Sequence, residues 1–478
     1  MSLFHSKITL APVPPALQDI PATVDAAPSV APSFDAHTNA DFLALNADQQ
    51  ATVQNVFSFL LSSSKEFQIS GPAGVGKTHL MKFIMQHTLK EYKMACQILG
   101  KRHVDFTIAL CATTNKAAEV LTQATSFPAS TIHSFMSLKI KDNYSTGKSD
   151  IQKTRDWKVH HNTLIFIDEA SMIDADLHEY IKQGTDSTCK IIYLGDACQM
   201  APVFEEISPI YANPTNVSTL SIPMRNSGQP ALMALCNQLR DTVKTGVFQP
   251  IDEVPGAIDH VDDQQAFDFV NVAFLTPEPT ARILAYSNLK VQEYNRFIRN
   301  LRGLPATFVE GERLINNSSI PLNVGDNIFN LAIESEIEIL KINSAPYTVW
   351  ASDDLNSDFD VYDVEFAVIG HKGAAGTRFR KQLPVNHDRV DQLIKAFAKR
   401  KNWERYFYMK KDFPDFRQRD ASTVYKAQGS THETIFLDLT NIGSCTNNSQ
   451  LARMLYVGAS RATTRLLTYG ALPKRLFI

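Results

Sequence analysis

Short apolar runs alternate with helical stretches from residue 45 onward. Four of the runs are short and largely apolar, and we interpret them as strands buried on both faces: EFQIS at 66–70, FTIAL at 106–110, TLIFID at 163–168 and KIIYLGD at 190–196. Strands separated by helices are the order of a parallel sheet in an α/β fold. We therefore expect a first α/β lobe over residues 43–215.

A second α/β block begins near residue 220. It contains a helical stretch at 228–243 and a strand at 281–286, and it resumes with apolar runs at 434–439 and 465–470. Between these pieces, residues 320–370 alternate apolar and polar positions with a period of two, which predicts a small antiparallel barrel or sheet. The expected domains are thus a second lobe at 216–318 and 420–478, interrupted by a β-rich insertion at 319–419.

Residues 1–42 are rich in Ala and Pro and have neither helical nor strand periodicity. Such a segment buries too little apolar area to offset the entropy of ordering it. We interpret it as a flexible tail, with a partner-docking arm as the alternative.

Composition excludes several classes of protein. The 478 residues are 44% hydrophobic and 20% charged, with a formal net charge of −3, so the chain is globular and is not a polycation. The six cysteines are scattered without metal-ligand spacing, which favours reduced structural thiols over disulfides or zinc. Without a long apolar run or secretory leader, we expect a soluble cytoplasmic protein with no membrane contact.

Positive charge is concentrated in residues 371–420, which hold fourteen Lys or Arg against six Asp or Glu. Within this stretch, KAFAKRKNWERYFYMKK mixes basic and aromatic side chains, as a groove for single-stranded nucleic acid requires. The alternative is an amphipathic helix that packs its aromatic side chains and leaves its charges in solvent. Taken alone, the segment favours that alternative.

The segment GPAGVGKT, residues 71–78, follows an expected strand and precedes an expected helix, which is the context of a phosphate-binding P-loop. Its backbone N–H groups would cradle phosphates, with Lys77 reaching the β- and γ-phosphates and the Thr78 hydroxyl binding Mg²⁺. The nucleotide contacts expected of the loop come from Gly71, Pro72, Ala73, Gly74, Val75, Gly76, Lys77 and Thr78.

Two acids end the apolar strand TLIFID. Asp168 is placed to hold the Mg²⁺ shell, and Glu169 is placed to orient or deprotonate the attacking water. A further strand leads into LGDACQMAPV, where we expect Gln199 to contact the γ-phosphate and Asp196 to brace the turn.

In this order the motifs resemble those of the superfamily 1B helicases, the RecD/Dda-like 5′-to-3′ DNA helicases, and most closely the phage Dda type. The resemblance runs from about Leu45 to the C-terminus. It implies two RecA-like P-loop NTPase lobes with parallel sheets, a hairpin insertion in the first lobe at about 136–157 and an SH3-like character for the β-rich insertion. The segment LNADQQA resembles the Q motif and implies that Gln49 contacts adenine.

The other motifs imply DNA contacts and catalytic arginines. CATTNKAAEVL and ASTIHSF resemble motifs Ia and Ib, and ASTVYKAQGST resembles motif V with Tyr425 where a His is usual. The DNA-contacting residues implied are Thr113, Thr114, Asn115, His133, Thr423, Lys426, Ser430 and Thr431. LSIPMRNS and RMLYVGASRA resemble motifs IV and VI, and imply that Arg225 and Arg461 stabilise the charge on the γ-phosphate, coupling hydrolysis to closure of the lobes.

Residues 136–155 read as two short strands around a polar turn, which resembles the wedge hairpin of such helicases. Tyr144 at its tip is the expected strand-splitting aromatic, and an exposed tyrosine on an ordinary surface hairpin is the alternative.

We thus expect an ATP- and Mg²⁺-dependent DNA helicase that moves 5′ to 3′ on single strands and opens forked duplexes as a monomer. The Dda likeness suggests phage replication or recombination, in a bacterial host cytoplasm and beside single-strand-binding or recombination proteins. One alternative is an ATP-driven translocase that strips proteins from DNA without unwinding it. The other is a recombination accessory that uses ATP binding as a switch.

Overall fold

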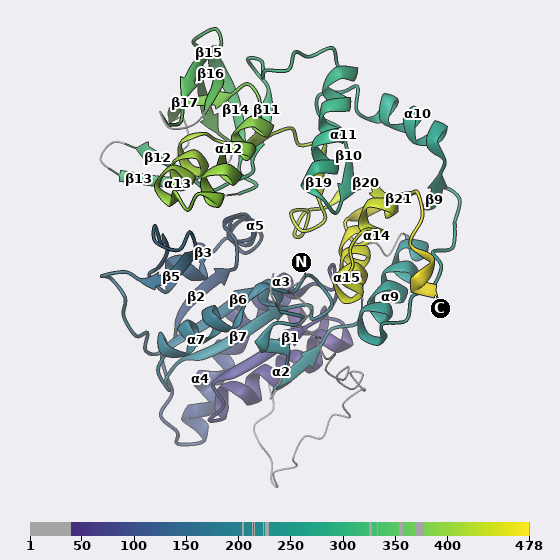
Figure 1. Cartoon of the computed structure of the whole chain (residues 1–478). Helices are drawn as coiled ribbons and strands as arrows, with labels where there is room; N and C mark the ends of the chain where they lie inside the picture. Colours follow the sequence, from purple (N-terminus) through teal and green to yellow (C-terminus); the bar gives the residue numbers. More distant parts are fainter. Residues whose placement is uncertain are drawn as a thin grey trace, which may run out of the picture.

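The computed structural model describes residues 40–477, apart from 203–204, 213, 215, 223, 225–228, 325–326, 332, 353–356 and 370–376. The chain folds into two α/β lobes and a β-rich body (Figure 1). In Figure 1 the first lobe lies at the bottom in purple and blue, the second at the right in teal and yellow, and the β-rich body at the upper left in green.

The first lobe is built on a six-stranded sheet whose strands are all parallel, in the order β3-β2-β6-β7-β1-β8. Its strands are β1 (Glu66–Ser70), β2 (Thr107–Ala112), β3 (Ala129–Thr131), β6 (Thr163–Asp168), β7 (Lys190–Gly195) and β8 (Val217–Thr219). Its main helices are α2 (Ala47–Leu61), α3 (Lys77–Phe83), α4 (Leu89–Ile98), α5 (Asn115–Thr125) and α7 (Ala175–Gln183). Every residue of β7 is buried, in keeping with its apolar sequence after Lys190.

Short elements complete this lobe. They are α1 (Ala40–Leu43), the π-helix η1 (Ile84–Thr88), α6 (Ile132–Phe135), the 3₁₀ turn η2 (Ala170–Met172) and α8 (Pro209–Ala212). A hairpin of β4 (Leu138–Asp142) and β5 (Ser149–Lys153) projects from it, with Tyr144 in the turn.

The second lobe has a parallel sheet in the order β19-β10-β20-β21-β9. Its strands are β9 (Ile258–Val261), β10 (Ala281–Ala285), β19 (Ala421–Thr423), β20 (His432–Asp438) and β21 (Ala462–Tyr469). Its helices are α9 (Pro230–Thr245), α10 (Asp263–Ala273), α11 (Asn288–Leu301), α14 (Leu439–Gly443), α15 (Asn448–Ala459) and the 3₁₀ turn η3 (Lys474–Phe477). The strand β10 precedes the β-rich body in the chain and pairs with β19 and β20, which follow it, so that body is an insertion.

The insertion is an antiparallel sheet in the order β15-β16-β14-β11-β18, with β17 also paired to β16. Its elements are β11 (Arg313–Asn316), β12 (Ile320–Val324), β13 (Asn327–Leu331), β14 (Glu336–Ile342), β15 (Tyr347–Trp350), β16 (Asp358–Val368), β17 (Arg378–Pro384), α12 (His387–Lys399), α13 (Trp403–Asp412) and β18 (Phe416–Arg417). The first strand begins before the expected boundary at 319. The predicted fold class is confirmed: two parallel-sheet lobes, a hairpin in the first and a β-rich insertion in the second.

The buried Lys190 ties α2 to the sheet of the first lobe. Its ammonium donates to the carbonyls of Ser62 at 2.7 Å and Ser64 at 2.6 Å, and to that of Phe59 at 3.2 Å. These carbonyls lie at the C-terminal end of α2, where helix carbonyls have no partner within the helix and a cation is favourable. The opposite end of α2 lies under the P-loop, so this anchor helps to fix the loop's support.

Of the helices in the described ranges, none has the length and apolar character needed to cross a membrane. All six cysteines fall within those ranges and are free thiols, as expected from their scattered positions.

Candidate nucleotide and nucleic-acid site

The segment 71–76 forms a tight loop between β1 and α3, at the carboxyl end of the parallel sheet of the first lobe. Gly76 precedes α3 with φ +83°, and a Cβ there would stand 2.6 Å from the amide nitrogen of Gln49. A Cβ on Gly71 would stand 2.5 Å from the carbonyl oxygen of Leu220. Both positions therefore require glycine, one for its backbone angle and both for lack of space. The predicted strand, loop and helix are present in that order.

Lys77 turns back over this loop. Its ammonium donates to the carbonyls of Gly71 at 2.7 Å and Pro72 at 2.9 Å. Burial lowers the pKa of Lys77, while the nearby carboxylates of Asp196 and Asp168 oppose that shift. A half-buried ammonium bonded to two backbone carbonyls, at the mouth of a loop of N–H donors, suits a polyphosphate that would replace those carbonyls.

The two acids predicted to serve catalysis lie at the end of β6. Burial raises the pKa of Asp168 to about 6, the charge on Glu169 adds to the rise, and Lys77 opposes it. Asp168 is thus a buried carboxylate beside a second one, a pairing that a cation would relieve. Glu169 has a left-handed backbone, with φ 55°, directly after the strand.

These acids and Thr78 offer oxygen donors, the ligand type that Mg²⁺ prefers. Over the part of the chain that the structure describes, no group of three or more His, Cys, Asp or Glu could form an all-protein metal cage. The donor set fits a Mg²⁺ that keeps most of its ligands as water and phosphate, because that ion takes only one or two carboxylates in such sites.

The turn after β7 joins the two lobes. Asp196 is fully buried and accepts a hydrogen bond from the Tyr456 hydroxyl at 2.6 Å, with Arg240 at 3.5 Å. Arg453 donates to the carbonyls of Ala197 at 2.5 Å and Gln199 at 2.6 Å. These three partners lie on α9 and α15 of the second lobe. The side-chain oxygen of Gln199 is buried without a hydrogen bond, as befits a group that awaits a ligand.

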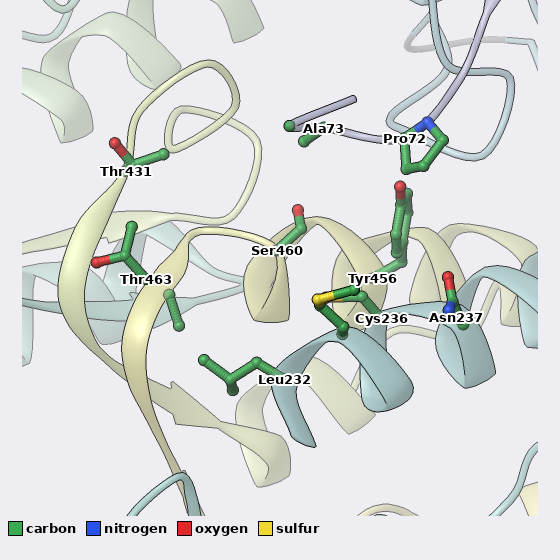
Figure 2. Close-up of a pocket in the computed structure, with 12 residues that line it drawn as sticks. Pro72, Ala73, Leu232, Cys236, Asn237, Thr431, Tyr456, Ser460 and Thr463 are labelled. Carbon is green, nitrogen blue, oxygen red and sulfur yellow. The ribbon is translucent and has the colours of Figure 1, made fainter. Parts of the chain in front are cut away.

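A pocket opens between the P-loop and the second lobe. Figure 2 shows Pro72 and Ala73 of the loop on one side, and Tyr456, Ser460 and Asn237 on the other. The remaining lining residues are Gly74, Leu232, Met233, Cys236, Thr431, Ala462 and Thr463. The pocket therefore lies where a nucleotide on the P-loop would meet the second lobe.

Gln49 lies beneath the P-loop, fully buried. Its Nε2 donates to the carbonyl of Val75 at 3.2 Å, and its Oε1 accepts from the backbone N–H of Asn46 at 3.2 Å, forming a capping box on α2. Both atoms of the amide thus support the loop and the helix start. The adenine contact expected of Gln49 stays a prediction.

Two of the predicted DNA contacts open α5 at the carboxyl edge of the first sheet. Thr114 caps this helix by accepting from the N–H of Ala117 at 3.1 Å, and Asn115 is its exposed first residue. The hydroxyl of Thr113 is buried without a hydrogen bond. His133 is half-buried on α6, and burial lowers the pKa of its imidazole, so its ring is held neutral.

The motif V residues cover the start of β20. Thr423 accepts from the N–H of Lys426 at 3.4 Å, and Ser430 donates to the carbonyl of Ala427 at 2.8 Å. Burial lowers the pKa of the Lys426 ammonium, and the carboxylate of Glu334 opposes that shift. Thr431 lines the pocket described above, and its contact with DNA stays a prediction. Tyr425, where the family has His, accepts a hydrogen bond from the Gln450 amide of α15.

The hairpin tip lies against the β-rich insertion. Tyr144 keeps 57% of its surface exposed, yet its ring meets that of Phe407 on α13 edge to face, with 5.0 Å between centroids. Lys411 of α13 forms an ion pair with Asp142 of β4. A Cβ on Gly147 would stand 2.3 Å from the Trp403 ring, so the tip fits closely against the helix.

The aromatic side chains of the basic segment pack with one another. Trp403 meets Tyr406 at 5.5 Å, Tyr406 meets Phe407 at 5.0 Å, and Phe407 is buried. Lys399, Arg400 and Lys401 are exposed between the two helices. The structure therefore favours the amphipathic alternative, in which the aromatics dock and the charges stay in solvent.

The two predicted catalytic arginines differ in outcome. Arg225 lies outside the described residues. Arg461 is buried and donates to the carbonyls of Val457 at 3.1 Å and Ser430 at 3.2 Å, both in its own lobe. Its role at the γ-phosphate stays a prediction.

Sequence reasoning missed the residues that join the lobes. Arg453 and Tyr456 stand inside the quoted motif RMLYVGASRA, and Gln428 stands inside the motif V segment. Their position in those motifs was the available signal, but their partners lie more than 250 residues away in the chain.

Two protein-family profiles and several known proteins match this chain. A profile of the AAA domain matches residues 54–205, and a profile of the UvrD-like helicase C-terminal domain matches residues 420–468. The ATP-dependent DNA helicase dda of Enterobacteria phage T4 is 22% identical over 445 residues, covering 85% of this chain and 96% of that protein. The resemblance to the superfamily 1B helicases is confirmed.

One further protein and one solved structure are also similar to this chain. The uncharacterized protein R530 of Acanthamoeba polyphaga mimivirus is 22% identical over 514 residues, covering 88% of this chain and 99% of that one. The Pif1 helicase from Bacteroides, solved with ADP-AlF3 and ssDNA, is 11% identical over 91% of this chain and 94% of that one, with a TM-score of 0.47. Within the superfamily 1B helicase frame, the AAA match spans the P-loop through the turn after β7, and the C-terminal match spans motifs V and VI.

Proposed function

We propose that this protein is an ATP-dependent DNA helicase that translocates 5′ to 3′ on single-stranded DNA. The observation that carries the proposal is the interlobe junction. The P-loop, the acids of β6 and the turn after β7 lie on one lobe, and the turn is bonded directly to the motif VI helix of the other. A nucleotide bound at the P-loop would thus act on the relative position of two lobes that both carry DNA-contact motifs.

At the nucleotide site, the loop N–H groups and Lys77 bind the β- and γ-phosphates, and Thr78 and Asp168 hold a Mg²⁺. Bound there, the ion neutralises charge on the phosphate oxygens. Glu169 accepts the proton of the attacking water, and Gln199 orients groups at the γ-phosphate. The support for these roles is the half-buried cation beside two carboxylates, and the unpartnered amide oxygen of Gln199.

At the nucleic-acid site, α5 and α6 of the first lobe and motif V of the second contact the strand, with Thr114, Asn115, His133, Thr423 and Lys426 among the contacts. Polarity rests on the family likeness, as does a role in phage replication or recombination. Binding of forked DNA as a monomer belongs to the same proposal.

Strand displacement on two duplexes, one with a 5′ single-stranded tail and one with a 3′ tail, tests the proposal, with ATP hydrolysis followed in the same tube. We expect only the 5′-tailed duplex to open. Strong DNA-stimulated hydrolysis with neither duplex opened would support the translocase instead. Slow hydrolysis that ignores DNA, with ATP-dependent strand binding, would support the recombination accessory.

The contact between the hairpin and the insertion predicts a variant that loses duplex unwinding but keeps ATP hydrolysis. In the Lys411→Glu variant, the carboxylate of Asp142 faces a like charge and the hairpin tip loses its hold on α13. We expect duplex unwinding to fall roughly fivefold, the equivalent of about 1 kcal/mol for a partly exposed ion pair. ATP hydrolysis on single-stranded DNA should change by less than about twofold, because the pair lies far from the P-loop.

The reversed pair provides the control. Asp142→Lys combined with Lys411→Glu restores opposite charges at the same two positions, so unwinding should recover. If the single and the double variant unwind as fast as the unaltered protein, the hairpin does not depend on this contact and its wedge role loses support.

A further inference from the structure

One hydrogen bond joins motif V to the acid expected to activate water. The Nε2 of Gln428 donates to Oε2 of Glu169 at 3.0 Å, across the boundary between the lobes. Glu169 follows β6 of the first lobe, and Gln428 lies in the loop between β19 and β20 of the second. The bond therefore connects the hydrolysis site directly to a segment that carries predicted DNA contacts.

The loop around Gln428 is ordered by local bonds that include those DNA-contact residues. The N–H groups of Lys426 and Ala427 both donate to the carbonyl of Thr423 at 3.1 Å, and the N–H of Ser430 donates to the carbonyl of Ala427 at 3.1 Å. These bonds order the chain on both sides of Gln428, whose own N–H donates to the carbonyl of Tyr425 at 3.4 Å, so a DNA strand that moves this loop also moves the amide. Within the described residues of this loop, the side chain of Gln428 is the group that bonds to the acid.

The amide is not fully satisfied where it stands. Its Oε1 is buried without a hydrogen-bond partner, while its Nε2 is bonded to the carboxylate. A buried polar atom without a partner raises the free energy of that arrangement. An arrangement in which both amide atoms have partners is therefore accessible, and a ligand that favours it shifts the population.

The bond also affects what Glu169 can do. The N–H donor of Gln428 occupies Oε2 of Glu169 at 3.0 Å, so a water molecule cannot bond to that oxygen from the same direction. During hydrolysis that carboxylate must take a proton from water as the new bond to the γ-phosphorus forms and the bond to ADP breaks. While Gln428 holds Oε2, one of the two carboxylate oxygens is occupied and the carboxylate is fixed in position, so it cannot turn toward the attacking water.

We propose that Gln428 is a positioning residue that restrains Glu169 until DNA binds at motif V. DNA at Thr423 and Lys426 draws the loop, and with it the amide, away from the acid, and hydrolysis accelerates. The inference rests on the proposed function, since it supplies the means by which DNA stimulates the ATPase.

The Gln428→Ala variant tests it through the rates with and without single-stranded DNA. We expect the DNA-free kcat to rise roughly fivefold or more, since a hydrogen bond to a charged group is lost. The DNA-stimulated kcat should stay within about twofold, so the stimulation ratio falls, while KM for ATP is unchanged. Loss of a merely structural group would instead lower both rates.

Two variants sharpen the experiment. Gln428→Glu sets a second carboxylate against Glu169 and removes the N–H donor, so it should raise the DNA-free rate as Gln428→Ala does. Gln450→Ala removes an amide that bonds to motif V through Tyr425 without touching Glu169, so its stimulation ratio should match that of the unaltered protein.

The outcomes separate the two proposals. If the unaltered protein shows no stimulation by DNA, the helicase proposal fails. If the unaltered protein is stimulated and Gln428→Ala keeps the same ratio, or loses both rates together, the restraint is overturned and the helicase proposal stands.

Discussion

The Lys77→Ala variant is expected to lose ATP hydrolysis by about a thousandfold or more, with DNA present or absent, because it removes the cation that stabilises charge on the γ-phosphate. Lys77 is half-buried and interacts with the carboxylates of Asp196, Asp168 and Glu169. Loss of the ammonium also removes a positive charge that opposes the raised pKa of Asp168. Duplex unwinding should disappear with hydrolysis.

Steady-state release of phosphate, measured with and without single-stranded DNA, checks this expectation. Lys82→Ala is the matched control, since Lys82 lies one and a half turns further along the same helix and away from the loop. It should hydrolyse ATP normally. DNA-stimulated hydrolysis retained by Lys77→Ala would remove the P-loop from the mechanism.

The second large effect is expected at the junction of the lobes. In Arg453→Ala, the carbonyls of Ala197 and Gln199 lose their buried donor, at a cost of about 2–5 kcal/mol for the pair. The turn that carries Gln199 is no longer held against the second lobe, so its amide is displaced from the γ-phosphate. We expect hydrolysis to fall about tenfold or more, since small displacements of positioning groups have large effects on rate, and the protein to unfold at a lower temperature.

ATPase kinetics and thermal unfolding of the nucleotide-free protein measure the two effects. Arg475→Ala is the control, because Arg475 also donates to backbone carbonyls, those of Gly443 and Cys445, but within the second lobe alone. It should leave hydrolysis unchanged. An Arg453→Ala protein that hydrolyses ATP at the normal rate would show that the junction is not part of catalysis.

The sequence predicts best those elements that are buried on both faces. TLIFID and KIIYLG become β6 and β7 within a residue of their expected ends, because a strand in the middle of a parallel sheet must be apolar throughout. The short strands β3, β8 and β9 were not predicted. They have three or four residues each, too few to show a period, and they form only when longer neighbours offer free edges.

The residues of the site also differ in how far they could be predicted from local sequence. Loop, strand-end acids and hairpin depend on local spacing, so their positions could be predicted from adjacent residues. The contacts of Arg453 and Gln428 depend on how the second lobe is placed against the first. No pattern among neighbouring residues of the sequence indicates that placement. For Gln49, the sequence motif predicted a contact with adenine, whereas in the structure its buried amide bonds to the start of α2 and to the P-loop. The basic segment was ambiguous because packing and nucleic-acid binding need the same alternation of aromatic and basic residues.

Two attachments between the halves of the molecule have a geometric consequence. Cys198 and Met200, in the turn after β7, are buried in the core of the second lobe, and the hairpin tip is fixed to α13 of the insertion. In Figure 1 the hairpin strand β5 lies at the left below α13 of the insertion, whereas α15 of the second lobe lies to the right. If both attachments are kept, the first lobe can rotate relative to the rest of the molecule only about the line that joins them. The two attachments therefore define a rotation axis. We therefore expect residues near that line to move least during a nucleotide cycle, and residues far from it to move most.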